Sequence, residues 1–220
     1  MNQPSQYLLC ALCVACAGGQ TTVERAGEAD APPSMECLPS AAQEGDFTEH
    51  MQFAWLLTEQ SFEVEAPSAP PASARTVELQ DWTDVTLQPW LAQKTRLVEA
   101  ARAELNVAAE EAHPQRTMAG ALVALMYEDV ARVIRRVPVP DELRSEPEIA
   151  IVFREVIDAQ ARPYLDHARR AYRACALNSR GHSELRHWMR FCEERGAELP
   201  TSLAALQSGE TVVEVIVAPE

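Results

Sequence analysis

Residues 118–137 read MAGALVALMYEDVARVIRRV, and their apolar side chains recur at intervals of three and four. This period predicts an α-helix that buries one face against other helices. Asp129, Arg132 and Arg136 fall outside the apolar series, so we expect them to point to water. Pro138-Val139-Pro140 predicts the end of the helix, because proline lacks the amide hydrogen that continues it. The apolar series consists of Met118, Leu122, Leu125, Met126, Val130, Val133, Ile134 and Val137.

The same period appears on both sides of this helix. It predicts an earlier helix over about Leu87–Ala108, a long one over Ile149–Cys175 that Pro163 kinks or divides, and a last one that starts near Leu185 and is closed by Gly196 and Pro200. Asp141 is a candidate cap for the long helix, and Asn178–Gly181 a turn. A first helix is expected to begin at a cap, Asp46 or Thr48, and to end near Gln60. The sequence therefore predicts a mainly α fold of antiparallel helical hairpins.

Residues 62–84 interrupt the helical pattern. Three prolines within Ala66–Ala74 disfavour a helix there. The flanking segments Phe62–Glu65 and Thr76–Leu79 alternate apolar and polar side chains, so we expect two short strands that pair as a small ribbon. Near the other end, Thr211–Val217 is rich in β-branched residues, which predicts an extended tail. This tail is expected to pair with the second strand or to lie along the helices, and a frayed terminus is the alternative.

The first eighteen residues have the features of an export signal. Tyr7–Ala17 is an apolar run, too short to span a bilayer, that ends in small residues. Val14-Ala15-Cys16-Ala17 resembles a bacterial lipobox, which predicts lipid attachment at Cys16. Cleavage after Ala17 and a chance apolar start of a cytosolic protein are the alternatives. By analogy with other lipoproteins, an alanine after the acylated cysteine favours the periplasmic face of the outer membrane; without the lipid, the protein is soluble in the periplasm or secreted.

The net charge of −14 is concentrated in the front part of the chain. Residues 17–89 hold thirteen acidic and two basic residues, whereas residues 90–208 hold seventeen of each. Residues 17–45 are also mostly small and polar, which predicts a flexible acidic tether. An acidic surface repels phosphate backbones, so nucleic acid is excluded as a partner. The chain has one lysine, Lys94, and we interpret its scarcity as a coding bias towards arginine.

The sequence lacks the common motifs of catalytic and nucleotide-binding sites. The patterns G-x-S-x-G, G-x-G-x-x-G and H-E-x-x-H and the P-loop are absent. His182 and His187 are five residues apart, which is not the i, i+4 spacing of a zinc site. Glu110 and Glu111 beside His113 would suit acid–base chemistry, but a solvated helix end is the stronger interpretation. We therefore expect no enzyme activity, no cofactor and no metal.

Three cysteines follow the export signal: Cys37, Cys175 and Cys192. Cys175 and Cys192 are seventeen residues apart, on either side of a turn around Ser179–Gly181, and each falls on the apolar side of its helix. An antiparallel hairpin in this register brings the two thiols to the same height. The sequence predicts a disulfide between them, with two buried free thiols as the alternative.

Several motifs follow one another in the second half of the chain, beginning with an alanine-rich helix at Lys94–Ala109. The others are Ala119-Gly120-Ala121, Met126-Tyr127-Glu128-Asp129-Val130, Arg135-Arg136-Val137-Pro138-Val139-Pro140-Asp141-Glu142-Leu143, Ala161-Arg162-Pro163-Tyr164-Leu165-Asp166-His167-Ala168, Gly181 and Trp188. With them, the segment from about Phe62 to Pro200 resembles the C-terminal part of tetratricopeptide-repeat envelope proteins of myxobacteria and their relatives. This resemblance implies paired, stacked helices and a place in the cell envelope, where some of these proteins belong to gliding-motility complexes.

These observations define an expected organisation and function. An export signal at 1–16 and the tether at 17–45 precede a helical domain at 46–208, and an extended tail follows at 209–220. We expect a non-catalytic envelope lipoprotein that presents a helical surface to another envelope protein and reaches the membrane through its lipid. An accessory factor of an envelope or peptidoglycan enzyme, and a soluble secreted helical protein, are the alternatives. The aromatic residues expected to line the partner-binding groove are Trp90, Tyr127, Tyr164 and Trp188.

Overall fold

The computed structural model of the chain describes residues 33–39 and 47–199, and in these ranges it is mainly helical and contains no strand. None of the described helices is long and apolar enough to cross a membrane. The α-helices are α1 (Glu49–Glu63), α2 (Thr76–Trp82), α3 (Gln88–Glu111), α4 (His113–Arg135), α5 (Asp141–Arg144), α6 (Pro147–Asn178) and α7 (Arg186–Glu198). Shorter helical turns occupy Met35–Cys37, Thr83–Leu87 and Ser183–Leu185.

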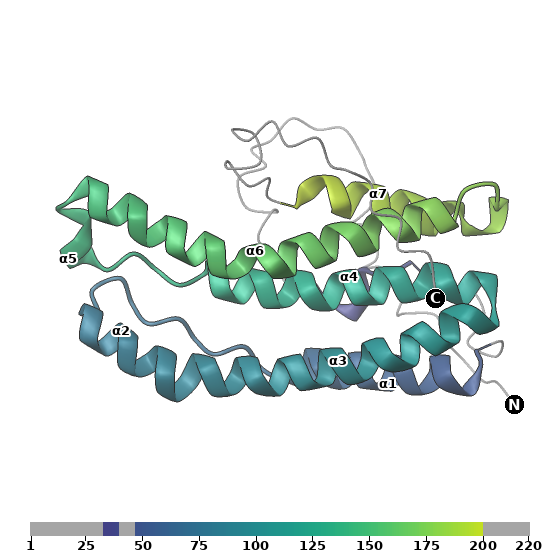
Figure 1. Cartoon of the computed structure of the whole chain (residues 1–220), viewed down its shortest axis with the longest axis horizontal. Coiled ribbons are helices and arrows are strands. Elements are labelled where there is room, and N and C mark those ends of the chain that lie inside the picture. Colours follow the sequence, from purple (N-terminus) through teal and green to yellow (C-terminus); the bar gives the residue numbers. More distant parts are fainter. Residues whose placement is uncertain (1–32, 40–46, 200–220) are drawn as a thin grey trace, which may run out of the picture. The chain divides into compact units, whose positions relative to one another are not determined.

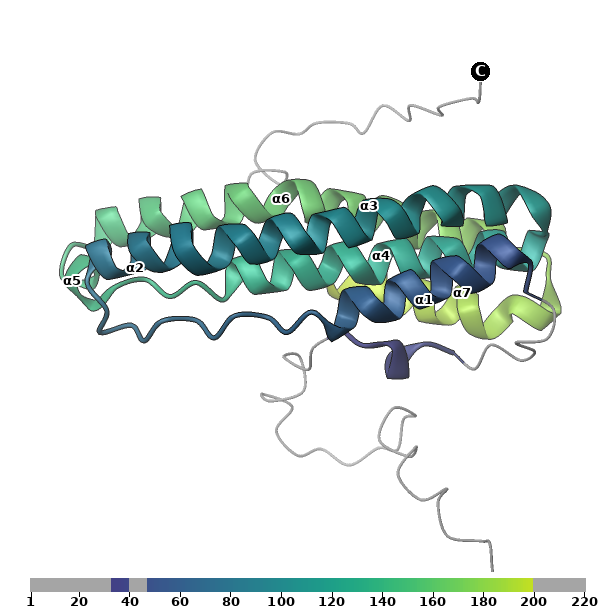
Figure 2. The same cartoon turned by 90° about the horizontal axis from the view of Figure 1, so that it is seen from below.

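Helix α4 lies at the centre of the described helices. Figure 1 shows α3 along one side of α4 and α6 along the other, and each helix runs antiparallel to its neighbour. Helix α1 packs on α3 and also contacts α4, whereas α7 packs on α6 and also contacts α4 (Figure 2). The mainly α fold expected from the sequence is confirmed; the stacking of a tetratricopeptide array stays a prediction.

The central position of α4 explains its composition. All eight members of the predicted apolar series are at most 8% exposed, as the period of three and four predicted. The expectation for two of the charged residues was wrong: Asp129 is only 6% exposed and Arg132 is half-buried, whereas Arg136 is exposed. Because other helices contact α4 on several sides, a polar side chain on it meets protein rather than solvent.

The segment that was expected to form a β-ribbon is helical at both ends. Phe62 belongs to the last turn of α1, and Thr76–Leu79 forms the start of α2. Four alternating residues also fit a helix when the next apolar residues follow at intervals of three to five, as Leu79, Trp82 and Leu87 do. Between the helices, Val64 and Ala66 pack against a small core cluster that contains Leu79 and Leu87.

Helix α2 continues into α3 through a π-helical turn at Thr83–Leu87. Pro89 explains this turn, because its ring clashes with the carbonyl four residues earlier and its nitrogen has no hydrogen to donate. Pro163, by contrast, lies inside α6 without dividing it. The expected helix cap at Thr48 is confirmed, since its side chain accepts a hydrogen bond from the Met51 amide.

Two other helix ends differ from the prediction. Asp141 does not cap the long helix: it opens the short helix α5, where its amide donates to the Ala72 carbonyl at 2.7 Å. Gly196 lies inside α7 rather than at its end. Gly181 adopts a φ of 81°, a conformation that glycine tolerates better than other residues, in the turn between α6 and α7.

The two ends of the chain fall largely outside the described residues. Cys16, most of the expected tether, Pro200 and the Thr211–Val217 tail are among the residues outside these ranges. Within the expected tether, however, residues 33–39 are described, and their Met35 and Leu38 side chains pack against the main core cluster.

Gly120 permits the close approach of α4 and α6. A Cβ atom at this position would lie 3.1 Å from the Ala171 carbonyl oxygen and 3.1 Å from the backbone nitrogen and Cβ of Cys175. At Gly196 in α7, the nearest atom to an added Cβ is Tyr172 Cβ at 3.4 Å, which is an ordinary contact.

We predict opposite effects of the same substitution at these two glycines. Gly120→Ala is expected to destabilise the protein by about 1–2 kcal/mol, because overpacking outweighs the gain in helix propensity. Gly196→Ala is expected to stabilise it by about 0.5–1 kcal/mol. Urea unfolding followed by circular dichroism measures both free energies. Equal stabilisation by the two alanines would contradict the close contact of α4 and α6.

Candidate functional site

The described residues contain a buried polar centre in the middle of α4. Asp129 forms ion pairs with Lys94 Nζ through Oδ2 and with Arg132 Nη2 through Oδ1, each at 2.7 Å. Lys94, on α3, is 0% exposed; its ammonium also donates to the Ser61 carbonyl on α1 and lies 4.9 Å from the centre of the Phe62 ring. Burial lowers the pKa of the Lys94 ammonium, and the Asp129 carboxylate opposes this effect. The pair thus joins α1, α3 and α4.

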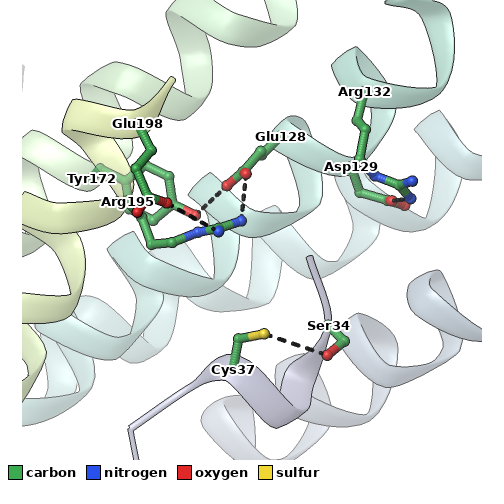
Figure 3. A network of polar contacts seen from close by, with 8 residues as sticks. All are labelled: Ser34, Cys37, Glu128, Asp129, Arg132, Tyr172, Arg195 and Glu198. Carbon is green, nitrogen blue, oxygen red and sulfur yellow. Dashed lines mark hydrogen bonds and ion pairs between the residues drawn. The ribbon is translucent and has the colours of Figure 1, made fainter. Parts of the chain in front are cut away.

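The preceding residue, Glu128, points to different neighbours because successive helical residues are separated by about 100° around the axis. Its carboxylate accepts a hydrogen bond of 2.6 Å from the Tyr172 hydroxyl on α6 and pairs with Arg195 Nη2 on α7 at 2.5 Å (Figure 3). Arg195 also reaches Glu198 at 3.4 Å. Burial raises the pKa of Glu128, while Arg195 and Tyr172 act in the opposite direction. Burial likewise raises the pKa of the Tyr172 hydroxyl.

These two networks have the residue types of acid–base chemistry but an arrangement that suits packing. Lys94, Asp129 and Tyr172 are buried, and none of the network residues lines the groove described below. A catalytic acid or base must come within hydrogen-bond reach of a substrate. We therefore interpret both networks as contacts that hold the helices together. Within residues 33–39 and 47–199, no three His, Cys, Asp or Glu side chains come together in a way that could hold a metal ion.

The four aromatic residues predicted to line one groove do not lie together. Trp188 is 1% exposed in the main core cluster, and Trp90 is 7% exposed in the small cluster beside α2. Tyr127 and Tyr164 do meet, with ring centroids 6.4 Å apart. The two tryptophans thus lie in separate parts of the core, and only the two tyrosines share a site.

The two tyrosines belong to a cluster of polar and aromatic side chains from α3, α4 and α6. The Tyr127 ring stacks on His167, with centroids 4.8 Å apart. Its hydroxyl accepts a hydrogen bond from Arg102 at 2.9 Å and donates one to Glu99 at 3.1 Å. Tyr127 itself is 5% exposed, whereas His167 is exposed at the surface of α6. The cluster therefore presents a histidine and two charged side chains to solvent above a buried ring.

The remaining histidines stand in pairwise contacts. His113 and His182 lie with ring centroids 3.9 Å apart, where the α3–α4 and α6–α7 connections meet. His182 Nδ1 is 3.1 Å from Glu184, and His187 lies beside Trp188. His50 pairs with Glu104 at 2.7 Å, and this hydrogen bond raises the pKa of His50. The structure thus separates His182 and His187 into different environments.

The cysteines fall into two groups in the structure. Cys175 and Cys192 are joined by a disulfide between α6 and α7, with Cα atoms 6.1 Å apart and both residues buried. Cys37 is a half-buried free thiol whose sulfur lies 3.7 Å from Ser34 Oγ (Figure 3). The disulfide holds α7 on α6 about one turn from Tyr172 and Arg195, so it supports the Glu128 network.

A groove of about 700 Å³ lies between the end of α1 and the first half of α3. Its lining includes two exposed carboxylates, Glu63 and Glu65, and two exposed amides, Gln60 and Gln93. Trp90 lies in the apolar part of the lining, and its buried indole nitrogen has no hydrogen-bond partner among the described residues. None of the eight residues that line the groove is basic.

Sequence reasoning missed the groove and the polar centre, although one signal for the latter was present. The apolar series of α3 has a gap between Leu91 and Leu97, and the position within it that continues the spacing of four from Trp90 to Val98 is Lys94. A lysine whose ammonium is buried with such a stripe needs an acid as its partner. The only interpretation that we attached to this residue, a coding bias, overlooked its position.

Comparison with known protein families, curated proteins and solved structures gives no match to the chain. The resemblance to tetratricopeptide-repeat envelope proteins therefore stays a prediction.

The Lys94–Asp129 pair gives a stability prediction. Asp129→Asn leaves the buried ammonium without its carboxylate and is expected to destabilise the protein by at least about 3 kcal/mol. The matched control is Asp158→Asn, which breaks the partly exposed pair with Arg135 and is expected to cost less than about 1 kcal/mol. Chemical denaturation measures both changes. Similar small losses in the two variants would show that the buried pair does not hold the helices.

Proposed function

We propose that the protein is a non-catalytic cell-envelope lipoprotein whose helical domain binds another envelope protein. The observation that supports this proposal best is a row of exposed aliphatic side chains on the first half of α6. Ile149, Val152 and Val156 are 42%, 57% and 53% exposed. Their spacing of three and four places them on one face of the helix. Exposed apolar side chains that cluster in this way are typical of protein-interaction surfaces.

The same face of α6 continues towards the aromatic cluster. Pro163 and His167 follow Val156 at seven and eleven residues, close to two and three turns of helix, and His167 is the residue that stacks on Tyr127. An apolar row that ends at a histidine and a buried tyrosine offers both apolar contact and hydrogen-bonding groups. We propose that an apolar helix of the partner lies along this face of α6.

The interaction is tested by photo-crosslinking in living cells. A photo-reactive amino acid at position 152 is expected to give one defined adduct with a partner protein, and Val156→Asp is expected to reduce its yield at least about tenfold, because the charge opposes burial of the face. The control is Val107→Asp, which places the same charge at an exposed valine of α3 and should leave the adduct unchanged. Equal yields in both variants would refute the site. An adduct with a second copy of the chain would show that this face of α6 mediates self-association rather than binding of another protein.

The proposed place of the protein in the envelope rests on the sequence around Cys16. A lipid on this cysteine would hold the helical domain at the periplasmic face of the outer membrane. Labelled palmitate is expected to be incorporated into the wild-type chain and lost in Cys16→Ser, and globomycin is expected to cause the precursor to accumulate. Retention of label and membrane fractionation by Cys16→Ser would contradict the anchor.

A further inference from the structure

The groove between α1 and α3 has the charge and the shape of a site for a positively charged side chain. Glu63 and Glu65 form no ion pair with a described residue, although both carboxylates line the groove. The segments that build the groove, residues 47–65 and 76–97, contain seven acidic residues and two basic ones, and one of the basic residues, Lys94, is already paired with Asp129. Their combined field attracts a cation.

The end of α1 adds to this negative potential. The carbonyl groups at the C-terminus of a helix carry a partial negative charge, which basic side chains commonly balance. Helix α1 has no basic residue in its last turn and ends instead at Glu63. The Lys94 ammonium donates a hydrogen bond to the Ser61 carbonyl from the core side, but its charge is already balanced by Asp129. On the groove side, the two carboxylates and the helix end face a lining without a cation.

The apolar and amide residues of the lining indicate which kind of positively charged ligand the groove would bind. Leu97 and Trp90 offer apolar surface that suits the methylene stem of a long basic side chain. Gln60 and Gln93 carry amide donors for which peptide carbonyl groups are acceptors, and the indole N–H of Trp90 lacks an acceptor. A polyamine would supply the positive charge, but it has no hydrogen-bond acceptor for these donors. The guanidinium of arginine pairs with carboxylates through two parallel hydrogen bonds and stacks on the faces of aromatic rings.

We propose that this groove binds an arginine-bearing extended peptide segment of a partner protein, with the guanidinium between Glu63 and Glu65 and the peptide backbone along the two glutamines. The site is separate from the exposed face of α6, so it does not depend on the function proposed above.

The test measures binding of a fluorescein-labelled peptide, Gly-Arg-Leu-Arg-Gly, to the full-length protein by fluorescence anisotropy at low salt. The double variant Glu63→Gln/Glu65→Gln is expected to weaken binding about fivefold or more, as loss of two partly exposed ion pairs implies. The matched control, Glu193→Gln/Glu194→Gln, removes the same charge from exposed positions on α7 and is expected to leave the affinity within about twofold.

Two comparisons separate a specific site from general attraction. A peptide with citrulline in place of arginine keeps the shape without the charge and should bind much more weakly, and spermidine should displace the arginine peptide only at far higher concentration. Equal binding of the citrulline peptide, equal losses in the two double variants, or efficient displacement by spermidine would each overturn the proposal.

Because the glutamates are exposed, both variants are expected to retain the wild-type melting temperature. Val156→Asp should not change peptide binding, which keeps this test independent of the α6 site.

Discussion

The buried ion pair between Lys94 and Asp129 is the constraint on which the arrangement of the helices depends. Two opposite charges without access to water must meet in one geometry, so the pair permits only one register of α3 against α4. The Ser61 carbonyl extends this constraint to α1. The neighbouring residue, Glu128, constrains α6 and α7 in the same way, through its contacts with Tyr172 and Arg195. Two adjacent acids in α4 thus align the four helices that surround it.

Apolar packing alone would leave this alignment weakly specified. The core is rich in alanine, and small side chains tolerate sliding between helices better than large ones that interlock. Gly120 brings α4 and α6 into backbone contact, and the disulfide holds α7 on α6. The polar networks and these two contacts supply the specificity that the small side chains do not.

The sequence predicted the helices well because their period extends over many turns, as in the series from Met118 to Val137. The prediction failed where a pattern covered only a few residues, and where the burial of a polar side chain was predicted from that residue alone. The four residues Thr76–Leu79 fit a strand and a helix equally, and only the tertiary contacts of Leu79 decide between them. Asp129 was expected in water because its own chemistry favours water, whereas its partner, Lys94, lies 35 residues earlier in the chain. The groove was invisible for the same reason, since its two walls come from segments that no local pattern connects.

The burial of Lys94 has a consequence for the surface chemistry of the whole chain. It is the single lysine in 220 residues, and its amine is enclosed by protein. The folded protein therefore offers no lysine to acetyl donors, aldehydes or succinimidyl esters, while its arginines maintain the positive charge that balances the acids of residues 90–208. Labelling at Lys94 itself, as distinct from an N-terminal amine, thus becomes a measure of unfolding, because an accessible Lys94 appears only when α1, α3 and α4 separate.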